Sequence, residues 1–218
     1  IDAYDKNLFG SGIWSEFSFY GGTRNRNGII SIGLNNLFKS SWTIALGGYS
    51  SFKQMFLYSR NLRLSKETYD IQRNGELRED RYGLIADLTR SLGTSGILQS
   101  RFRFEQQRIY DIQPDSSIGY SPILTWKLSS TIDTRDDADL PHFGSLVDLS
   151  LETSLSMLKQ QRTFSRITAS YSQSISNNNI TITPKFMSVF SDNATPNPEY
   201  YSLGRDDMFF GKREDDQR

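Results

Sequence analysis

Two segments of alternating polarity, Ser121-Pro-Ile-Leu-Thr-Trp-Lys-Leu-Ser-Ser-Thr-Ile132 and Ser145-Leu-Val-Asp-Leu-Ser-Leu-Glu-Thr-Ser-Leu155, lie on either side of a polar break. Large apolar residues take every second position of both segments: Leu124, Trp126 and Leu128, then Val147, Leu149 and Leu151. Polar or charged residues stand between them. Alternation with a period of two predicts β-strands that have one apolar face and one wet face.

The break itself contains Asp133-Thr-Arg-Asp-Asp137 and Leu140-Pro-His-Phe-Gly144. Acidic residues, proline and glycine favour turns, because they bond their own backbone, fix φ or allow positive φ. The two segments are therefore predicted to form a hairpin. Its apolar face contacts either a protein core or lipid.

Alternating segments recur through most of the chain, whereas the three-and-four spacing of a helix is almost absent. Together with the central hairpin they predict an all-β chain of about eleven antiparallel strands. The expected strands outside that hairpin are 13–20, 28–35, 42–48, 54–61, 63–72, 81–91, 97–108, 164–174 and 180–189.

Composition excludes several classes of protein. The 218 residues carry 25 Lys+Arg and 25 Asp+Glu, so no net field favours nucleic acid or an acidic substrate. There is no Cys and one His, which excludes a disulfide framework and a thiolate metal site. No signal peptide is visible, and no apolar run reaches the ~18 residues of a membrane helix. Barrel strands, which alternate, never show such a run.

Strand length favours lipid over a soluble core. The runs 97–110 and 81–92 exceed the usual 5–6 residues of a strand and reach the roughly 9–11 residues that cross a bilayer with tilt. The linkers differ in length, as in a barrel with short turns at one end and long loops at the other. A soluble two-sheet sandwich, with its charged residues on solvated outer faces, is the alternative.

The hairpin resembles a known family. Asp133, Arg135 and Asp136, followed by Pro141 and Gly144 between two alternating strands, look like the D-x-R-D…P…G hairpin of the BamA-type superfamily of outer-membrane assembly and two-partner-secretion barrels, the bacterial surface antigen domain. The segments 28–38, 42–48 and 54–62 are similar to that family's second to fourth strands. The resemblance implies that residues 1–218 are one partial outer-membrane β-barrel domain, the first eleven strands of an up-and-down transmembrane barrel of sixteen, with more chain expected beyond both ends.

A second motif departs from the family. The stretch from Tyr200 to Gly211 stands where the family has a long lumen loop with a Leu-Gly-Gly…Val-Arg-Gly-Phe/Tyr pattern, and it matches at Leu203, Gly204 and Gly211. Phe210 replaces the family's arginine, however, and Arg205 replaces the second glycine. Lys212 and Arg213 are nearby cations that are candidates to substitute. The loss of the arginine resembles barrels fused behind patatin-like phospholipase domains, but this chain has no Gly-x-Ser-x-Gly elbow.

Each of several other residue groups has two interpretations, one functional and one purely structural. Asp133, Arg135 and Asp136 either pin a lumen loop or form a hydrogen-bonded turn, and the turn is preferred. The acidic residues Asp206, Asp207, Glu214, Asp215 and Asp216 have no ligand spacing of a known metal loop, so they indicate a solvated loop. His142 indicates a turn residue. Aromatic residues near strand ends form either interfacial girdles or ordinary strand aromatics.

The expected function is that of a bacterial outer-membrane barrel that anchors, inserts or translocates polypeptide. Its expected partners are membrane lipid, and a polypeptide substrate or soluble domains fused upstream, with no nucleic acid. No cofactor, metal or enzymatic activity is expected, because no nucleophile–base or carboxylate pair stands out. The alternatives are the barrel anchor of a patatin-like phospholipase and a soluble β-sandwich binding module.

Overall fold

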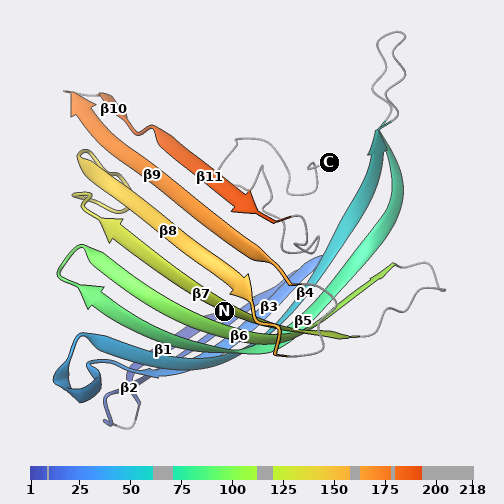
Figure 1. Cartoon of the computed structure of the whole chain (residues 1–218), viewed down its shortest axis with the longest axis horizontal. Helices are drawn as coiled ribbons and strands as arrows, with labels where there is room; N and C mark the ends of the chain where they lie inside the picture. The colour runs from blue at the N-terminus through green and yellow to red at the C-terminus, as the bar shows by residue number, and fades with distance from the viewer. Residues whose placement is uncertain (9, 61–70, 112–119, 158–162, 178–179, 193–218) are drawn as a thin grey trace.

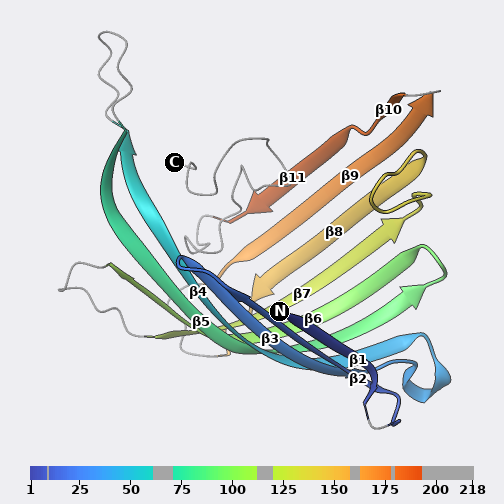
Figure 2. The same ribbon diagram turned by 180° about the vertical axis from the view of Figure 1, so that it is seen from behind.

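One antiparallel sheet contains every strand of the computed structural model, which describes residues 1–8, 10–60, 71–111, 120–157, 163–177 and 180–192 (Figures 1 and 2). The strands are β1 (Asp2–Leu8), β2 (Ile13–Gly21), β3 (Asn25–Leu34), β4 (Trp42–Arg60), β5 (Ile71–Leu92), β6 (Gly96–Asp111), β7 (Ser121–Asp133), β8 (Gly144–Ser154), β9 (Ser165–Asn177), β10 (Ile180–Ile182) and β11 (Lys185–Ser191).

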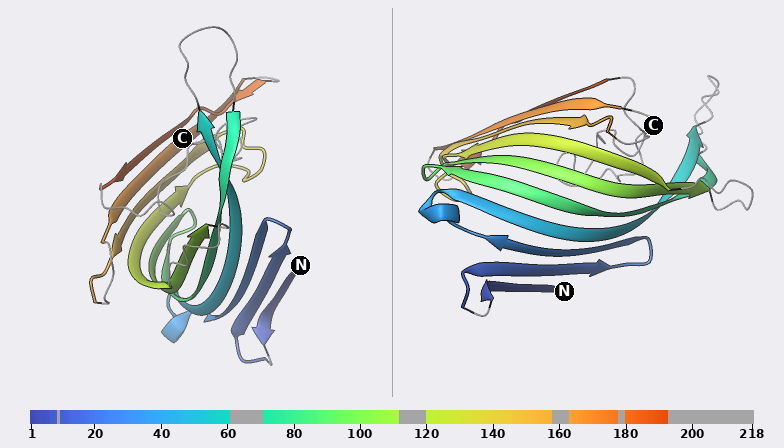
Figure 3. Two further views of the ribbon diagram at one scale, coloured as in Figure 1. Left: turned by 90° about the vertical axis from the view of Figure 1, so that its right-hand side faces the viewer. Right: turned by 60° about the horizontal axis from the view of Figure 1, so that its bottom comes forward.

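The topology is a simple up-and-down meander. Each strand from β1 to β9 pairs with its neighbour in sequence, and β10 and β11 both pair with β9. The sheet curls into an open trough, as Figure 3 shows. Strand β1 lies at one edge and β10 with β11 at the other. The described residues therefore form the wall of a barrel that is not closed, as expected for a partial up-and-down barrel.

The last strand is broken by proline. Strand β10 pairs Ile180 to Ile182 with β9, and β11 resumes at Lys185 opposite Ser172. Between them Pro184 has no N–H to give to the ladder, although its carbonyl accepts a hydrogen bond from the Gln173 N–H at 3.2 Å. The segment 180–189, expected as one strand, is thus two strands along one edge of β9.

The expected all-β class is confirmed, and four strand boundaries are corrected. The segments 42–48 and 54–61 are one strand, β4, because the polar stretch Ser50-Ser51 stays paired to both neighbours. Strand β5 likewise runs through Glu76 to Asp80, where no strand was expected. Strand β1, whose sequence Asp-Ala-Tyr-Asp-Lys-Asn-Leu hardly alternates, was missed. Strand β3 begins at Asn25, three residues before the expected start at Gly28.

The two ends of the sheet differ in their connections. At the short-turn end lie the turns Leu8–Ile13, Leu92–Gly96 and Asn177–Ile180; at the long-connection end lie the connections Arg60–Ile71, Asp111–Ser121 and Ser154–Ser165. The expected segregation is incomplete, since the long turn from Asp133 to Gly144 lies at the short-turn end. The β4–β5 hairpin extends past the β6 pairing, which stops at Leu77, toward the long-connection end (Figure 1).

In the part of the chain that the structure describes, helical structure is confined to one short 3-10 turn, Leu37–Lys39. Within the described ranges, no helix has the length and apolar character needed to cross a membrane.

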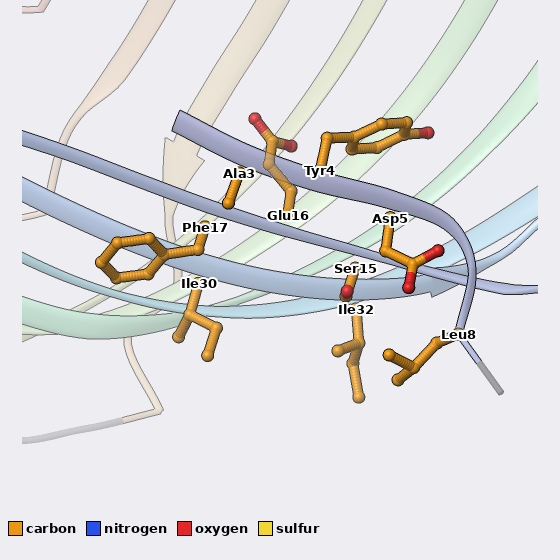
Figure 4. Close-up of a pocket in the computed structure, with 9 residues that line it drawn as sticks. All are labelled: Ala3, Tyr4, Asp5, Leu8, Ser15, Glu16, Phe17, Ile30 and Ile32. Carbon is orange, nitrogen blue, oxygen red and sulfur yellow. The ribbon is translucent and has the colours of Figure 1, made fainter. Parts of the chain in front are cut away.

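The convex face is apolar and exposed. Cross-strand register aligns its side chains in rows, such as Phe17↔Ile30↔Gly48↔Leu84↔Phe104↔Leu124. Ile30, Leu84 and Phe102 are 59%, 64% and 48% exposed. Figure 4 shows the alternation at the β1 edge, where Phe17, Ile30 and Ile32 point to one side and Tyr4 and Glu16 to the other.

The packed interior is polar rather than apolar. Among the described residues only Ile123 and Phe164 are buried apolar side chains, whereas Glu79, Glu105, Gln107, Thr125 and Glu152 are buried on the concave side. A two-sheet sandwich would bury the apolar face between its sheets. One sheet with its apolar side outward is instead the arrangement of a barrel wall, so the soluble sandwich alternative is wrong.

Candidate functional site

The concave face of the trough is lined with charge. Cross-strand register places eight mid-strand charges on this one side: Arg101, Arg103, Glu105, Lys127, Asp148, Glu152, Arg166 and Lys185. They come from β6 to β11. Within each strand, these charged residues alternate with the exposed apolar residues. Successive side chains of a strand point to opposite faces, so all the charged residues share the concave face.

Glu105 of β6 lies at the centre of this wall, and its side chain is fully buried. One carboxylate oxygen, Oε2, accepts hydrogen bonds from the Tyr49 hydroxyl and from Arg103 Nη1, the latter at 3.1 Å. The other, Oε1, faces Arg81 Nη1 at 3.6 Å and accepts no hydrogen bond from the described residues. Burial of an anion is costly unless cations and donors surround it, which is the arrangement here.

Arg103 connects two carboxylates across three strands. Its guanidinium contacts Glu105 on its own strand, Thr125 Oγ1 on β7 at 3.2 Å and Glu152 Oε1 on β8 at 3.0 Å. Glu152 Oε2 accepts a further bond of 2.5 Å from Arg166 Nη2 on β9. The result is a chain of alternating charge that runs from Arg81 on β5 to Arg166 on β9 along the concave wall.

Two satellite ion pairs flank this chain. Arg81 of β5 contacts Glu79 Oε1 at 2.5 Å, and Gln107 donates to the same oxygen at 2.7 Å. Arg101 and Asp87 form a bidentate pair with distances of 2.7 and 2.8 Å. Bidentate Arg–carboxylate pairs combine strength with fixed geometry, so they hold the register of β5 against β6.

Gly83 makes the central contact possible. It lies directly between Tyr49 and Glu105 in the register of β4, β5 and β6. A Cβ at this position would stand 2.4 Å from the Phe104 carbonyl oxygen and 2.9 Å from Glu105 Cβ. Because glycine has no side chain, the Tyr49 ring reaches over β5 to the Glu105 carboxylate, and an aromatic ring covers the glycine.

The side chain of Lys127 makes no hydrogen bond or ion pair to a described residue. It lies between Arg101 on β6 and Glu152 on β8 in the cross-strand register. Both oxygens of Glu152 are already bonded, to Arg103 and Arg166. A half-buried ammonium without its own anion is available to an acidic group that enters the trough.

The turn between β7 and β8 gathers the motif residues Asp133, Arg135, Asp136, Pro141 and Gly144 at the short-turn end. Arg135 donates from Nε and Nη2 to the two carboxylate oxygens of Asp133, at 2.9 and 2.8 Å, and from Nη1 to the Ala138 carbonyl at 3.1 Å. These are bonds within one turn. The interpretation as a hydrogen-bonded turn accounts for them, while a role in pinning a lumen loop stays a prediction.

Asp136 and Asp137 close the loop through backbone bonds. Asp136 Oδ1 accepts the N–H groups of His142 and Phe143 at 2.9 and 3.0 Å. Asp137 Oδ1 accepts those of Asp139 and Leu140. The Phe143 N–H bond is the main reason that the pKa of Asp136 is lowered, and the Leu140 N–H bond is the main reason for the lowered pKa of Asp137. His142 is a turn residue, as expected, with Nδ1 3.6 Å from Asp136 Oδ2.

Gly144 ends the turn with φ of +99°, in the left-handed region that favours glycine. A Cβ here would stand 2.3 Å from the Thr134 carbonyl oxygen and 2.6 Å from Arg135 Cα. The motif glycine is therefore required both for its backbone conformation and for the close approach of the two arms of the turn.

The lumen-loop motif lies outside the described residues: Leu203, Gly204, Phe210, Gly211, Lys212 and Arg213. The acidic residues from Asp206 to Asp216 lie there too. Within the described residues no group of three or more metal-binding side chains comes together.

The alternating pattern predicted the face on which the wall charges lie, but not which charges meet. The sequence analysis did not single out Tyr49 and Gly83, because their contact with Glu105 depends on the register of three strands. A glycine in the middle of a strand, flanked by strands with an aromatic residue and a glutamate, is the clue that the sequence contained.

Comparison with known proteins identifies one family. A family model described as the Omp85 superfamily domain matches residues 7–194. No curated protein matches the chain.

Proposed function

This chain belongs to the Omp85 superfamily, and from that premise we propose that it forms part of a bacterial outer-membrane β-barrel that inserts, anchors or translocates polypeptide. One observation carries the proposal. The sheet is apolar and exposed on its convex side and charged on its concave side. Only a lipid-embedded wall with a wet lumen gives both faces a suitable solvent.

The dimensions of the apolar band support a membrane. On β4, Trp42 and Phe52 bound the outward apolar residues Ile44 and Leu46. Ten residue steps of strand rise about 33 Å, and a tilt of about 35–45° reduces this to a height of roughly 25 Å. That is the height of the apolar band of outer-membrane barrels.

The open edges also belong to the proposal. Among the described residues, β1 pairs with β2 alone and β10 and β11 pair with β9 alone, and lipid offers no hydrogen bond to the open edge of a sheet. We infer that further strands complete the barrel in the membrane. No catalytic group is assigned to this domain, and its partners are lipid on the convex side and polypeptide on the concave side.

The charged wall suits a polypeptide ligand better than a small molecule. The cations and anions of the wall alternate. A polypeptide that passes along it can therefore form ion pairs with wall residues of the opposite sign without meeting a uniform field. The ammonium of Lys127 is available to form such an ion pair with an acidic residue of the polypeptide. No metal or cofactor is needed for this role.

A second candidate function is the barrel anchor of a patatin-like phospholipase. Phe210, which stands where assembly barrels have an arginine, favours it. In that case the barrel displays or secretes a fused lipase rather than serving other polypeptides. The sequence of the gene on both sides of this segment distinguishes the two: soluble repeats upstream indicate an assembly or translocation factor, and a lipase domain indicates the anchor.

The experiment uses introduced cysteines in the full-length protein, since this segment has none. Leu149→Cys on the convex face and Ser150→Cys on the concave face are adjacent in β8. After isolation of outer membranes, a water-soluble maleimide should label Ser150→Cys and spare Leu149→Cys, whereas a lipid-soluble maleimide should label Leu149→Cys. Equal labelling of both by the water-soluble reagent, or recovery of the protein without detergent, contradicts the proposal.

Transport itself requires a separate measurement. Cells without the gene are compared with cells that carry it, by quantifying the polypeptides of the outer membrane and the medium. Loss of several unrelated polypeptides supports insertion or translocation. Loss of only the domain fused to this barrel supports the anchor.

A further inference from the structure

We propose that Lys127, Ser129 and Ser150 form a carboxylate-binding site on the concave wall, and that this site takes an acidic residue of a polypeptide in the trough. The inference rests on the proposed function and makes it more specific. It names the chemistry of the polypeptide ligand, acidic side chains, and the place on the wall where they bind.

Register places the three side chains next to one another. Lys127 and Ser129 are successive concave-facing residues of β7, so their Cα atoms lie about 7 Å apart along the strand. Ser150 of β8 stands directly opposite Ser129, which makes it a diagonal neighbour of Lys127 at roughly 7–8 Å. A lysine side chain is long enough to lean over either serine, so one carboxylate can contact the ammonium and a hydroxyl together.

The ammonium has no anion of its own among the described residues. Lys127 is half-buried in the wall. Glu152, the residue opposite it on β8, accepts hydrogen bonds on its two carboxylate oxygens from Arg103 and Arg166. A cation that has lost part of its hydration gains more from an anion than one in bulk water does, because the local dielectric constant is lower. An entering carboxylate therefore stabilises Lys127.

A second cation stands beside the ammonium. Arg101 of β6 lies directly opposite Lys127 in the register, and like charges at opposite positions are unfavourable. Arg101 is held by its bidentate pair with Asp87. An anion bound at Lys127 relieves the repulsion between the two cations. A single unpaired ammonium next to a paired arginine suits the monoanionic carboxylate of Asp or Glu better than a phosphate dianion.

The serine hydroxyls add hydrogen-bond donors. Ser129 and Ser150 are half-buried, and neither makes a side-chain hydrogen bond to a described residue. The same wall shows how such hydroxyls hold a carboxylate. Thr131 of β7 and Ser170 of β9 donate to the two oxygens of Asp148, at 2.7 and 3.3 Å. Hydroxyls on neighbouring strands thus bind a carboxylate between them, and the site at Lys127 adds a positive charge to this arrangement.

Lys185 of β11 provides an internal comparison. It also faces the trough and makes no ion pair to a described residue, but it is exposed on an edge strand. An exposed ammonium is well hydrated, and its ion pairs contribute little. We therefore expect an acidic residue to bind at Lys127 in preference to Lys185.

The test measures the binding of two fluorescent peptides to the full-length protein in nonionic detergent micelles, by fluorescence anisotropy. One peptide repeats Asp-Ser-Gly, and the other has Asn in place of each Asp. The wild-type protein should bind the acidic peptide about fivefold more tightly, and Lys127→Gln should bind the two equally. Lys127→Arg, which keeps the charge, should retain most of the preference. The heat-modifiable shift on gels checks that each variant is folded.

Lys185→Gln is the matched control, because it removes the same charge from the same face. It should leave the preference unchanged, and an equal loss in Lys185→Gln and Lys127→Gln would reduce the effect to net charge and overturn the site. Replacing Ser129 and Ser150 together by Ala should reduce the preference about twofold. An unchanged preference would overturn the role of the serines. Displacement of the acidic peptide by less inorganic phosphate than acetate would overturn a carboxylate site.

Failure of this site and failure of the proposed function can be distinguished. Equal binding of the two peptides by the wild-type protein, or binding of neither, overturns the site. If cells without the gene nevertheless lose polypeptides from the outer membrane, the proposed function stands. If those polypeptides are unchanged, the proposed function fails as well.

Discussion

At the scale of the residue, two glycines decide whether neighbouring groups can meet. Gly83 leaves the space through which Tyr49 reaches Glu105, and Gly144 lets the β7–β8 turn close on Thr134. At both positions an added Cβ would meet backbone or Cβ atoms. Such atoms cannot move aside as the end of a flexible side chain can. Single methyl groups should therefore have measurable effects at these two places.

Gly83→Ala should destabilise the folded barrel by about 1–3 kcal/mol, because the new Cβ overlaps the Phe104 carbonyl and the backbone of β6. The matched control is Gly48→Ala on the adjacent strand, where a Cβ meets its nearest atoms at 3.8 Å and should cost far less. Urea unfolding of the full-length protein in detergent micelles, followed by tryptophan fluorescence, measures the difference. Equal midpoints for the two variants would contradict the proposed role of Gly83.

Gly144→Ala combines backbone strain with a clash and should cost more than Gly93→Ala. Gly93 also has positive φ, +68°, but nothing lies within 4 Å of its Cβ position, so only the strain of about 1 kcal/mol remains there. The same unfolding measurement applies. A smaller loss in Gly144→Ala than in Gly93→Ala would show that the turn relaxes around the added methyl.

At the scale of the element, the β7–β8 turn is a loop held by carboxylates. Asp133 pairs with Arg135, Asp136 bonds the far arm of the loop, and Asp137 bonds the residues that follow it. The turn therefore depends on the ionised state of its acids. Side-chain carboxylates, rather than backbone ladder bonds, make most of the hydrogen bonds within this connection.

Acid should loosen this turn. The pKa of Asp136 is lowered in the folded state by the N–H groups of Phe143 and His142. A lowered carboxyl pKa contributes stability above the ordinary value of about 3.9, and that contribution is lost as the pH falls through the folded pKa. Hydrogen exchange of the Phe143 and His142 amides, corrected for intrinsic rates, should show that their protection decreases as the pH falls through the folded-state pKa of Asp136.

Asp136→Asn is the control for the acid effect. Its side-chain oxygen still accepts a hydrogen bond, but it does not titrate, so protection of the Phe143 amide should be weaker and nearly independent of pH. An unchanged pH dependence in this variant would assign the effect to another acid, with Asp137 as the first candidate.

At the scale of the whole molecule, the two faces of the sheet require opposite solvents. Each row of exposed apolar residues continues across several strands, and the concave wall is continuous in charge from β5 to β9. A charge should therefore be tolerated on one face and rejected on the other at the same level of the sheet.

Leu149→Arg should destabilise the barrel in a bilayer by about 2–4 kcal/mol, the cost of arginine near the midplane. Leu149 is 52% exposed on the convex face. Ser150→Arg, one residue further along β8 and on the concave face, should change stability little. Folding of the full-length variants into vesicles, followed by the heat-modifiable shift on gels, compares them. Equal tolerance of both arginines would place the convex face in water.

The sequence was enough to predict the strands, their two faces and the position of the central turn, because these depend on local alternation and on the chemistry of Asp, Pro and Gly. It also showed which charges face the trough, since parity along a strand fixes the face. It did not show that 42–48 and 54–61 are one strand, because the polar Ser50-Ser51 stretch is held by its neighbours rather than by its own propensity.

Only the tertiary structure decided which distant residues meet. The contacts of Glu105 with Tyr49 and of Arg103 with Glu152 depend on the relative register of several strands. A shift of one residue in one strand would move each side chain to the other face. Register is set by the sheet as a whole, and a local pattern of residues does not contain it.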